Sequence, residues 1–302
     1  MIQSIKKYLR ETRYCIGIIE GYKLFEPVNY NNIHWIDLNG YLDGWFADPF
    51  IFDVDDKNVT ILAEEWYYPI NHGRLSKLTI DRKSFKLLNV KPILQLETHL
   101  SFPYFVKEDN VVFICPENQE SKSVKIYRYD EVKECLTNPV TLIDKPLMDV
   151  QIWRKDGVYY LSGVEYITGE QIDTKTLQIY TSENLFGPYT QSQIIASDFC
   201  DKRGAGIVIE HDGKDIRPSQ CCENNEYGTA VIFNEVSYNG LQFSEKEFAR
   251  ITRNKRRHNG LVLHTFNQCG NLTAIDSWDY THMYVGRFVE FLRKKFRKYI
   301  HS

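Results

Sequence analysis

The chain has 302 residues, of which 43% are hydrophobic and 25% charged, so it can form a packed core and is not globally disordered. Its formal net charge of −3 excludes the broad basic field of a nucleic-acid-binding protein. No run approaches the roughly 20 apolar residues of a transmembrane helix. The seven cysteines are odd in number and lack a CxxC spacing, which favours reduced cytosolic thiols over a disulfide framework or a zinc site.

A loose unit recurs five times along the chain, each time with polar residues beside a short apolar or aromatic segment. The intervals of roughly 50–58 residues are typical of four-stranded propeller blades. The units begin with Phe46–Phe52, His99–Phe105, Asp149–Trp153, Gly204–Glu210 and Leu261–Asn267. Because a propeller points the innermost strand of every blade at one axis, polar residues far apart in sequence are expected to share a central pocket.

Short β-segments separated by turn formers fill the rest of the middle of the chain. Pairs such as Asp156-Gly157, Asp212-Gly213 and Asn239-Gly240 stand between apolar runs, a strong signal for hairpins. The aromatic content of 14% also suits pleated sheets. We therefore predict an all-β fold, with a five-bladed β-propeller domain over residues 1–284.

Both ends of the chain differ from this middle. Met1–Tyr14 is basic and lacks the apolar core of a secretory signal. Gly286–Ile300 places apolar side chains at helical spacing and contains six basic residues against one glutamate, so residues 285–302 are expected to form a basic amphipathic helix. Such a helix either contacts an anionic membrane surface peripherally or packs its apolar side on the propeller.

Carboxylates recur at the starts of the predicted blades. Asp48 precedes Pro49 at the start of the first blade, where it is either a general base, a carboxylate that stabilises an oxocarbenium-like transition state, or a turn cap. Asp149 starts the third blade in the same way, and Glu117 lies in the second. We predict Asp48, Asp149 and Glu117 as catalytic residues. One of two consecutive glutamates after the strand Val59–Ala63 should face inward, and Glu65 is the one predicted to bind substrate.

Basic and amide residues dominate the fourth and fifth blades. Arg203, Arg217 and His264 could hold phosphate or carboxylate groups, with Gln220 beside them, which points to an anionic donor. His99 is a further candidate for substrate binding, or it braces a loop. No nucleotide-type GxGxxG is present and no spacing demands a metal, so we expect neither a cofactor nor a metal ion.

The order of these motifs resembles that of a known family. FADPF, EEW, HLSFPYF, PEN, RGAG, RPSQ, YG and LHTFN fall between Phe46 and Asn267 in the order seen in bacterial proteins similar to the N-terminal propeller region of plant glucosamine inositolphosphorylceramide transferase. That region resembles the five-bladed propeller of family-43-type glycoside hydrolases. The resemblance implies a five-bladed propeller and a place in surface-polysaccharide assembly.

The resemblance to the hydrolases is incomplete in the fourth blade. Asp48 matches their base in blade one and Asp149 matches the blade-three carboxylate that tunes their acid. Their blade-four glutamate is absent, and Arg203–Gly206 stands there instead. A basic residue at this place suits a phosphorylated leaving group, which needs its charge neutralised more than it needs a proton.

We therefore expect a cytoplasmic, membrane-peripheral glycosyltransferase of capsule or lipopolysaccharide biosynthesis. Its expected partners are a nucleotide-sugar donor and a saccharide or lipid-linked saccharide acceptor, not nucleic acid. The alternatives are a family-43-like glycoside hydrolase and a non-catalytic sugar-binding propeller.

Overall fold

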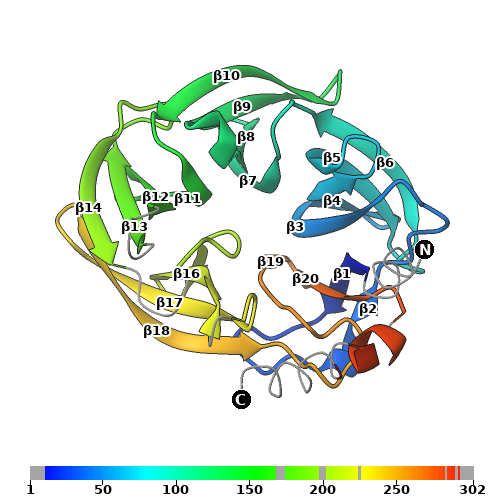
Figure 1. Ribbon diagram of the computed structural model, residues 1–302. Coiled ribbons are helices and arrows are strands. Elements are labelled where there is room, and N and C mark those ends of the chain that lie inside the picture. The colour runs from blue at the N-terminus through cyan, green and yellow to red at the C-terminus, as the bar shows by residue number, and fades with distance from the viewer. Residues whose placement is uncertain are drawn as a thin grey trace.

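Five four-stranded antiparallel sheets surround a central axis in the computed structural model, which confirms the predicted all-β five-bladed propeller (Figure 1). The structure describes residues 11–167, 174–196, 202–223, 226–282, 284–289 and 292. In the first four blades the strands lie in chain order from the axis outward. In the fifth blade two C-terminal strands lie nearer the axis and two N-terminal strands lie outside them.

The first two blades follow the predicted repeat. The strands of blade one are β3 (Gly44–Val54), β4 (Asn58–Tyr67), β5 (His72–Asp81) and β6 (Leu87–Leu94). Those of blade two are β7 (Ser101–Glu108), β8 (Val111–Glu117), β9 (Val124–Asp130) and β10 (Cys135–Ile143), with the short 3₁₀ helix η2 (Gln119–Ser121) between β8 and β9.

The next two blades are built in the same way. Blade three consists of β11 (Leu147–Lys155), β12 (Val158–Ile167), β13 (Thr174–Ser182) and β14 (Thr190–Ala196). Blade four consists of β15 (Ile209–His211), β16 (Lys214–Cys221), β17 (Ala230–Asn239) and β18 (Gln242–Thr252). Its inner strand is short, because the segment at residues 204–206 joins the sheet only through the isolated bridge between Gly204 and Ser219.

Blade five closes the ring by combining both ends of the chain. Its strands are β19 (Phe266–Cys269), β20 (Leu272–Tyr280), β1 (Thr12–Glu20) and β2 (His34–Trp35), with the 3₁₀ helix η1 (Tyr30–Asn32) between β1 and β2. The long antiparallel register from Thr12↔Tyr280 to Glu20↔Leu272 fastens the N-terminal strand to the C-terminal one. The strands β1, β19 and β20 contact β3, so the last blade packs directly against the first and the ring is closed.

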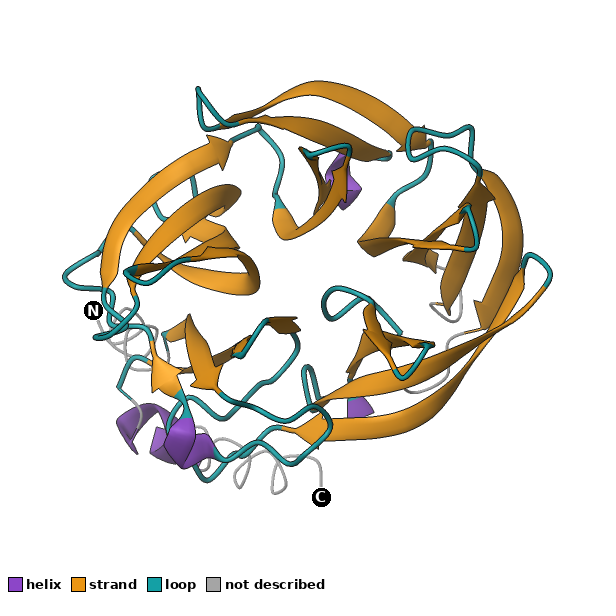
Figure 2. Ribbon diagram, turned by 180° about the vertical axis from the view of Figure 1, so that it is seen from behind, coloured by secondary structure: helices purple, strands orange, loops and turns teal. Residues whose placement is uncertain are grey.

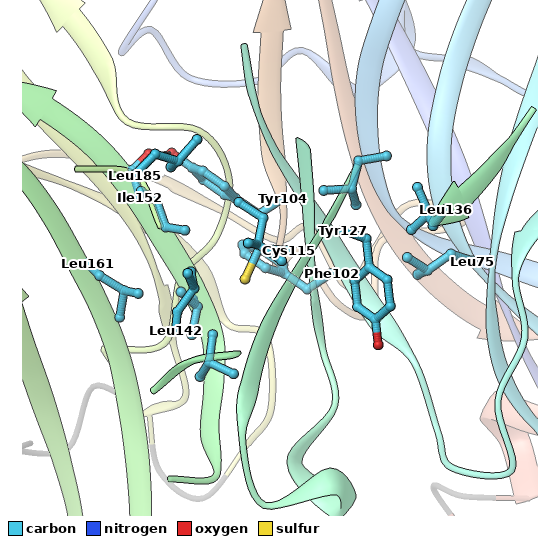
Figure 3. Packing of buried hydrophobic residues seen from close by; sticks show 14 of the residues in the cluster. Leu75, Phe102, Tyr104, Cys115, Tyr127, Leu136, Leu142, Ile152, Leu161 and Leu185 are labelled. Atoms are coloured by element: carbon cyan, nitrogen blue, oxygen red, sulfur yellow. Dashed lines mark hydrogen bonds between the residues drawn. The ribbon is translucent and has the colours of Figure 1, made fainter. Parts of the chain in front are cut away.

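Apolar side chains fill the wedges between neighbouring blades. One continuous cluster joins blades one, two and three and includes Leu75, Phe102, Tyr104 and Leu161 (Figure 3). Aromatic and β-branched residues on facing sheets bury this surface because alternate side chains of each strand point to the same face. The resulting rigid packing fixes the positions of the inner strands relative to the axis.

A short helix at residues 284–289 lies on the outside of blade five (Figure 2). Arg287 pairs with Asp279 of β20 at 2.6 Å, while Tyr284 and Phe288 are 83% and 59% exposed. Residues 290–291 and 293–302, which carry most of the basic charge of the predicted amphipathic helix, lie outside the described residues. In the described part of the chain, no helix has the length and apolar character needed to cross a membrane.

Candidate functional site

A cleft of about 340 Å³ opens at the propeller axis. All five blades contribute to it, as expected when every inner strand points at one line. Its lining consists of Tyr14, Trp45, Asp48, Glu64, Trp66, His99, Ser101, Glu117, Gln119, Met148, Asp149, Arg203, Gln220, Tyr227 and His264. Seven of the nine predicted site residues therefore meet in one cleft, and the other two, Glu65 and Arg217, do not.

Three inner strands carry the same β-bulge at the cleft. The register shifts between Ala47 and Phe50 in blade one, and the strand pairings of β7 and β11 shift at the corresponding places. The bulged residues Asp48, Phe102 and Asp149 adopt left-handed backbone conformations, with φ of 50°, 43° and 46°. Such conformations are strained for residues other than glycine, and bulges of this kind re-aim side chains next to functional sites.

Hydrogen bonds between blades hold the bulge at Asp48 in place. Its backbone N–H donates to Oδ2 of Asp276 on β20 at 3.0 Å. Its own carboxylate accepts the backbone N–H of Phe102 at 3.1 Å. Asp48 is therefore fixed from blade five on one side and blade two on the other, and only 5% of it is exposed.

His264 links the same two aspartates through its ring. Nε2 lies 3.2 Å from Oδ1 of Asp48, and Nδ1 lies 2.8 Å from Oδ1 of Asp276. Burial alone would lower the pKa of His264, but the charge of Asp276, with Tyr227 and the contacts to both aspartates, raises it well above the usual value. An imidazolium between two carboxylates is therefore the stable state near neutral pH.

The donor atoms of Asp48, His264 and Asp276 lie within 4.8 Å of one another, close enough to hold a metal ion. The two aspartates also accept backbone N–H groups: Oδ2 of Asp48 accepts that of Phe102, and Asp276 accepts those of Asp48 and, at 3.0 Å, Thr265. The imidazole of His264 therefore lies between two carboxylates that the backbone also holds in place.

Asp149 of blade three is held by blade four. Gln220 donates to its Oδ2 at 2.9 Å, and Arg203 lies 3.4 Å from the same oxygen. Burial raises the pKa of Asp149 to about 7, against the opposing charge of Arg203. Gln220 also donates to the carbonyl of Gly204 at 3.0 Å, which orients its amide. This carboxyl group can change protonation near neutral pH.

Two glutamates also contribute carboxyl groups to the cleft lining. Glu117 at the end of β8 accepts the hydroxyl of Ser101 at 3.0 Å and the backbone N–H of Gln119 at 2.9 Å, while burial raises its pKa. Glu64 on β4 faces the cleft and lies 3.6 Å from Nε2 of His99. Burial, reinforced by the charge of Asp48, raises the pKa of Glu64 well above its usual value.

Aromatic rings form much of the cleft wall. Trp45 and Trp66 stack at 5.5 Å between ring centroids, with an interplanar angle of 10°. Tyr14 packs against Trp45 at 4.9 Å and against His264 at 5.4 Å. Tyr227 lies under the guanidinium of Arg203 at 5.3 Å. Flat apolar faces beside hydrogen-bonding groups are the surfaces on which sugar rings bind.

The structure corrects the position of Glu65. It is fully buried on the opposite face of β4 from Glu64, where Arg74 on β5 donates to its two oxygens at 2.8 and 2.9 Å. Tyr41 and Ser76 also donate to it. Because successive side chains of a strand point to opposite faces of the sheet, Glu64 faces the cleft and Glu65 faces away from it. Glu65 is therefore part of an ion pair inside blade one.

Arg217 is likewise outside the cleft. It is fully buried in blade four, where its Nε donates to Glu245 on β18 at 2.8 Å and its guanidinium donates to Oε1 of Gln151 at 2.9 Å. A third bond reaches the carbonyl of Lys202 at 3.1 Å. These contacts join blade four to blade three. Of the two predicted arginines, Arg203 lines the cleft and Arg217 does not.

Several cleft residues were absent from the predicted set. Glu64 and Trp66 stand in the EEW motif, so strand alternation could have found them once the register was known. Tyr14 reaches the cleft only because β1 closes blade five. Asp276 lies behind the cleft on β20, in a segment without any repeated motif, and no sequence signal marks it.

The fold and the cleft together define a five-bladed propeller with a carboxyl-rich, aromatic-walled site on its axis. Residues 34–270 match the family described as "Glucosamine inositolphosphorylceramide transferase 1, N-terminal", and the chain belongs to this family.

Curated relatives with the same name as this family match the chain, and a solved structure has the same fold. Glucosamine inositolphosphorylceramide transferase 1 of Oryza sativa subsp. japonica is 27% identical over 198 residues, 64% of this chain and 26% of that protein. The protein of the same name in Arabidopsis thaliana is 23% identical over 243 residues, 76% of this chain and 31% of that protein. The chain thus spans about a quarter to a third of these relatives. The α-L-arabinanase of Cellvibrio cellulosa, solved with arabinohexaose, has the same fold with a TM-score of 0.50 at 14% identity, over 68% of this chain and 78% of that one.

Proposed function

We propose that this propeller catalyses glycosyl transfer in its central cleft, from a sugar donor to a hydroxyl group of a saccharide or glycolipid acceptor. The observation that carries the proposal is the rigidly held carboxylate of Asp48, fixed by backbone N–H groups and by His264 at the centre of an aromatic-walled cleft. Membership of a family named for a glycosyl transferase supports the same reaction class.

In the proposed mechanism Asp48 accepts the proton of the acceptor hydroxyl as its oxygen attacks the anomeric carbon. Those carboxyl groups of the cleft that are ionised stabilise the positive charge that develops on the sugar ring. Asp149, Glu117 and Gln220 bind sugar hydroxyl groups, and Trp45 and Trp66 offer an apolar platform to the ring. His264 keeps Asp48 in position and balances its charge.

For the donor we propose a nucleotide sugar whose sugar enters the cleft and whose phosphates remain near Arg203. The carboxyl groups around the axis favour an uncharged sugar ring there, while the guanidinium of Arg203, which contacts Asp149 from the side of blade four, is the cation proposed to attract the phosphates. The exposed apolar residues Tyr284 and Phe288 would bring the chain to a lipid-linked acceptor on the cytoplasmic side of a membrane. Surface-polysaccharide assembly is the setting that we propose for this transfer.

Hydrolysis of a glycosidic bond is the second candidate. It is favoured by the raised pKa values of Glu117 and Asp149, which make a carboxylic acid available in a cleft that already contains an anchored carboxylate. The two candidates differ in what accepts the sugar, a hydroxyl group of another molecule or water.

The test compares Asp48→Asn with wild type on a panel of nucleotide sugars, each with and without oligosaccharide acceptors. Asp53→Asn is the matched control, because Asp53 is an exposed aspartate on the same strand. Product formation that needs the acceptor and disappears only in Asp48→Asn supports transfer. Sugar release from oligosaccharides without any nucleotide donor supports hydrolysis instead, and full activity of Asp48→Asn would contradict both.

A further inference from the structure

Among the residues that the structure describes, four carboxyl groups line the cleft, and they differ in the partners they have. Asp48 accepts a backbone N–H and faces the ring of His264. Asp149 accepts the amide of Gln220 and lies beside Arg203. Donors and cations of this kind stabilise a carboxylate in its ionised form.

Glu117 has two neutral donors, the hydroxyl of Ser101 and the backbone N–H of Gln119. Glu64 accepts no hydrogen bond from any residue in the described part of the chain, although only 7% of it is exposed. A buried carboxylate without a donor is costly, whereas a buried carboxylic acid is not. By this comparison Glu64 is, of the four, the carboxyl group whose ionised form has the fewest stabilising contacts.

The nearest polar group to Glu64 is His99, and its hydrogen bonds keep it neutral. The backbone N–H of Gly73 donates to Nδ1 of His99 at 2.9 Å, so Nδ1 is an acceptor and the ring proton is on Nε2. A doubly protonated ring would lose that bond. Burial also lowers the pKa of His99. His99 therefore offers Glu64 a neutral N–H at 3.6 Å rather than a positive charge.

Gly73 makes this arrangement possible. A Cβ atom at this position would lie 2.5 Å from the carbonyl oxygen of Leu100 and 2.9 Å from Nδ1 of His99. Only glycine lets the backbone of β5 approach the ring closely enough to donate to it. The tautomer of His99 is thus built into the contact between blades one and two.

We propose that Glu64 holds a proton at neutral pH and, within the glycosyl chemistry proposed above, donates it to the leaving oxygen when the sugar comes from a glycoside, because an alkoxide needs a proton on departure and a phosphate does not. As the bond between the anomeric carbon and that oxygen breaks, its electron pair stays on the oxygen, which takes the proton of Glu64. The acceptor hydroxyl forms the new bond to the anomeric carbon and gives its proton to Asp48. Exchange with solvent then returns a proton to Glu64 and removes one from Asp48.

This role supplies the acid that is absent from blade four, where Arg203–Gly206 stands in place of a glutamate. The surroundings of Glu64 agree with it: burial and the charges of Asp48 and Glu117 raise its pKa, and only His264 opposes them strongly. The titratable groups that face Glu64 are Tyr14 on β1, Asp48 on β3, His99 before β7, Glu117 on β8, His264 before β19 and Asp276 on β20.

The location of the proton can be measured without any substrate. Protein labelled with ¹³C at the glutamate carboxyl carbon is titrated by NMR, and Glu64→Gln and Glu117→Gln identify the two cleft signals. We expect one glutamate carboxyl to remain protonated at pH 7 and its signal to vanish in Glu64→Gln. If the Glu64 signal titrated near the ordinary glutamate pKa of about 4.3, or if the protonated signal vanished only in Glu117→Gln, the inference would be overturned.

The catalytic part is tested with pairs of donors that share a sugar and differ in leaving group. Glycosyl fluorides need no proton on departure, whereas alkyl glycosides do. Glu64→Gln should lower kcat/KM for the alkyl glycoside by about 10²–10⁴-fold and leave the fluoride nearly unchanged. Equal losses on both donors, with an active wild type, would overturn the role of Glu64 alone. Failure of wild type to use either of these donors or any nucleotide sugar would overturn the proposed glycosyl transfer and this catalytic role with it.

Discussion

His264 in blade five lies 3.2 Å, Nε2 to Oδ1, from Asp48 in blade one. These residues are 216 positions apart in the sequence, and the circular closure of the propeller brings them together. The contact gives the buried carboxylate of Asp48 a cationic neighbour and fixes the orientation of its side chain. Asp48 is thus set apart chemically from the other carboxyl groups of the cleft.

Replacing Asp48 by asparagine should abolish most of the activity while leaving the fold intact. Asparagine keeps an oxygen for the N–H of Phe102 but has no charge and accepts no proton. We expect kcat to fall by about 10²–10⁴-fold, the range for loss of an acid–base group. Transfer assays measure the loss, and an unchanged melting temperature shows that the propeller remains folded. A variant with undiminished kcat would remove Asp48 from the chemistry.

Replacing Asp276 by asparagine should lower the pKa of His264. Asp276 is its principal negative neighbour, at 2.8 Å from Nδ1, and the charge is lost in the variant. The ring nitrogens of His264, observed by ¹⁵N NMR, should then titrate at lower pH than in wild type. Asp279→Asn, on the same strand, is the control and should leave the His264 titration in place. An unaltered titration in Asp276→Asn would show that Asp48 alone holds the imidazolium.

The propeller could be predicted from the sequence because each blade begins with a local apolar signal at nearly constant spacing. The inner strands follow those signals, and Asp48, Asp149 and His264 meet on the axis as the repeat predicts. Strand alternation alone did not decide between Glu64 and Glu65, since the bulge after Ala47 shifts the register of β3 against β4.

Arg217 illustrates the part of the site that sequence could not give. Its partners Glu245 and Gln151 come from β18 and from blade three, and the sequence around Arg217 does not predict either contact. An arginine beside a predicted binding loop has the same local sequence whether its side chain faces a cleft or forms a buried ion pair. Asp276 is a similar case, because the N–H groups that its carboxylate accepts come from Asp48 on β3 and from Thr265 just before β19.

Replacing Arg217 by alanine should therefore reduce stability, whereas replacing Arg203 by alanine should reduce donor binding. Arg217→Ala leaves Glu245 buried, with Lys202 at 3.5 Å as its remaining partner, and should lower the free energy of unfolding by about 3–5 kcal/mol. Arg203→Ala should change stability little and weaken donor binding instead. Urea denaturation and a thermal-shift titration with nucleotide sugars separate the two effects. Loss of donor binding in a folded Arg217→Ala protein would contradict the assignment.

Asp149 should make the wild-type protein less stable as the pH rises from about 4 to about 7. Its pKa is raised to about 7 in the folded state by burial, against about 3.9 when unfolded. Between these values the folded state binds more protons than the unfolded state, so the contribution of this group to stability is complete below pH 4 and is lost as the pH approaches 7. The size of the effect is at most about 4 kcal/mol.

Asp149→Asn removes this titration and keeps an oxygen that can accept the amide of Gln220. The difference in unfolding free energy between wild type and variant, measured in urea from pH 4 to pH 8, should therefore shift in favour of the variant as the pH rises. Asp53→Asn, an exposed change of the same kind, should show no such trend. A difference that stayed constant with pH would mean that the ion pair with Arg203 at 3.4 Å keeps Asp149 ionised throughout.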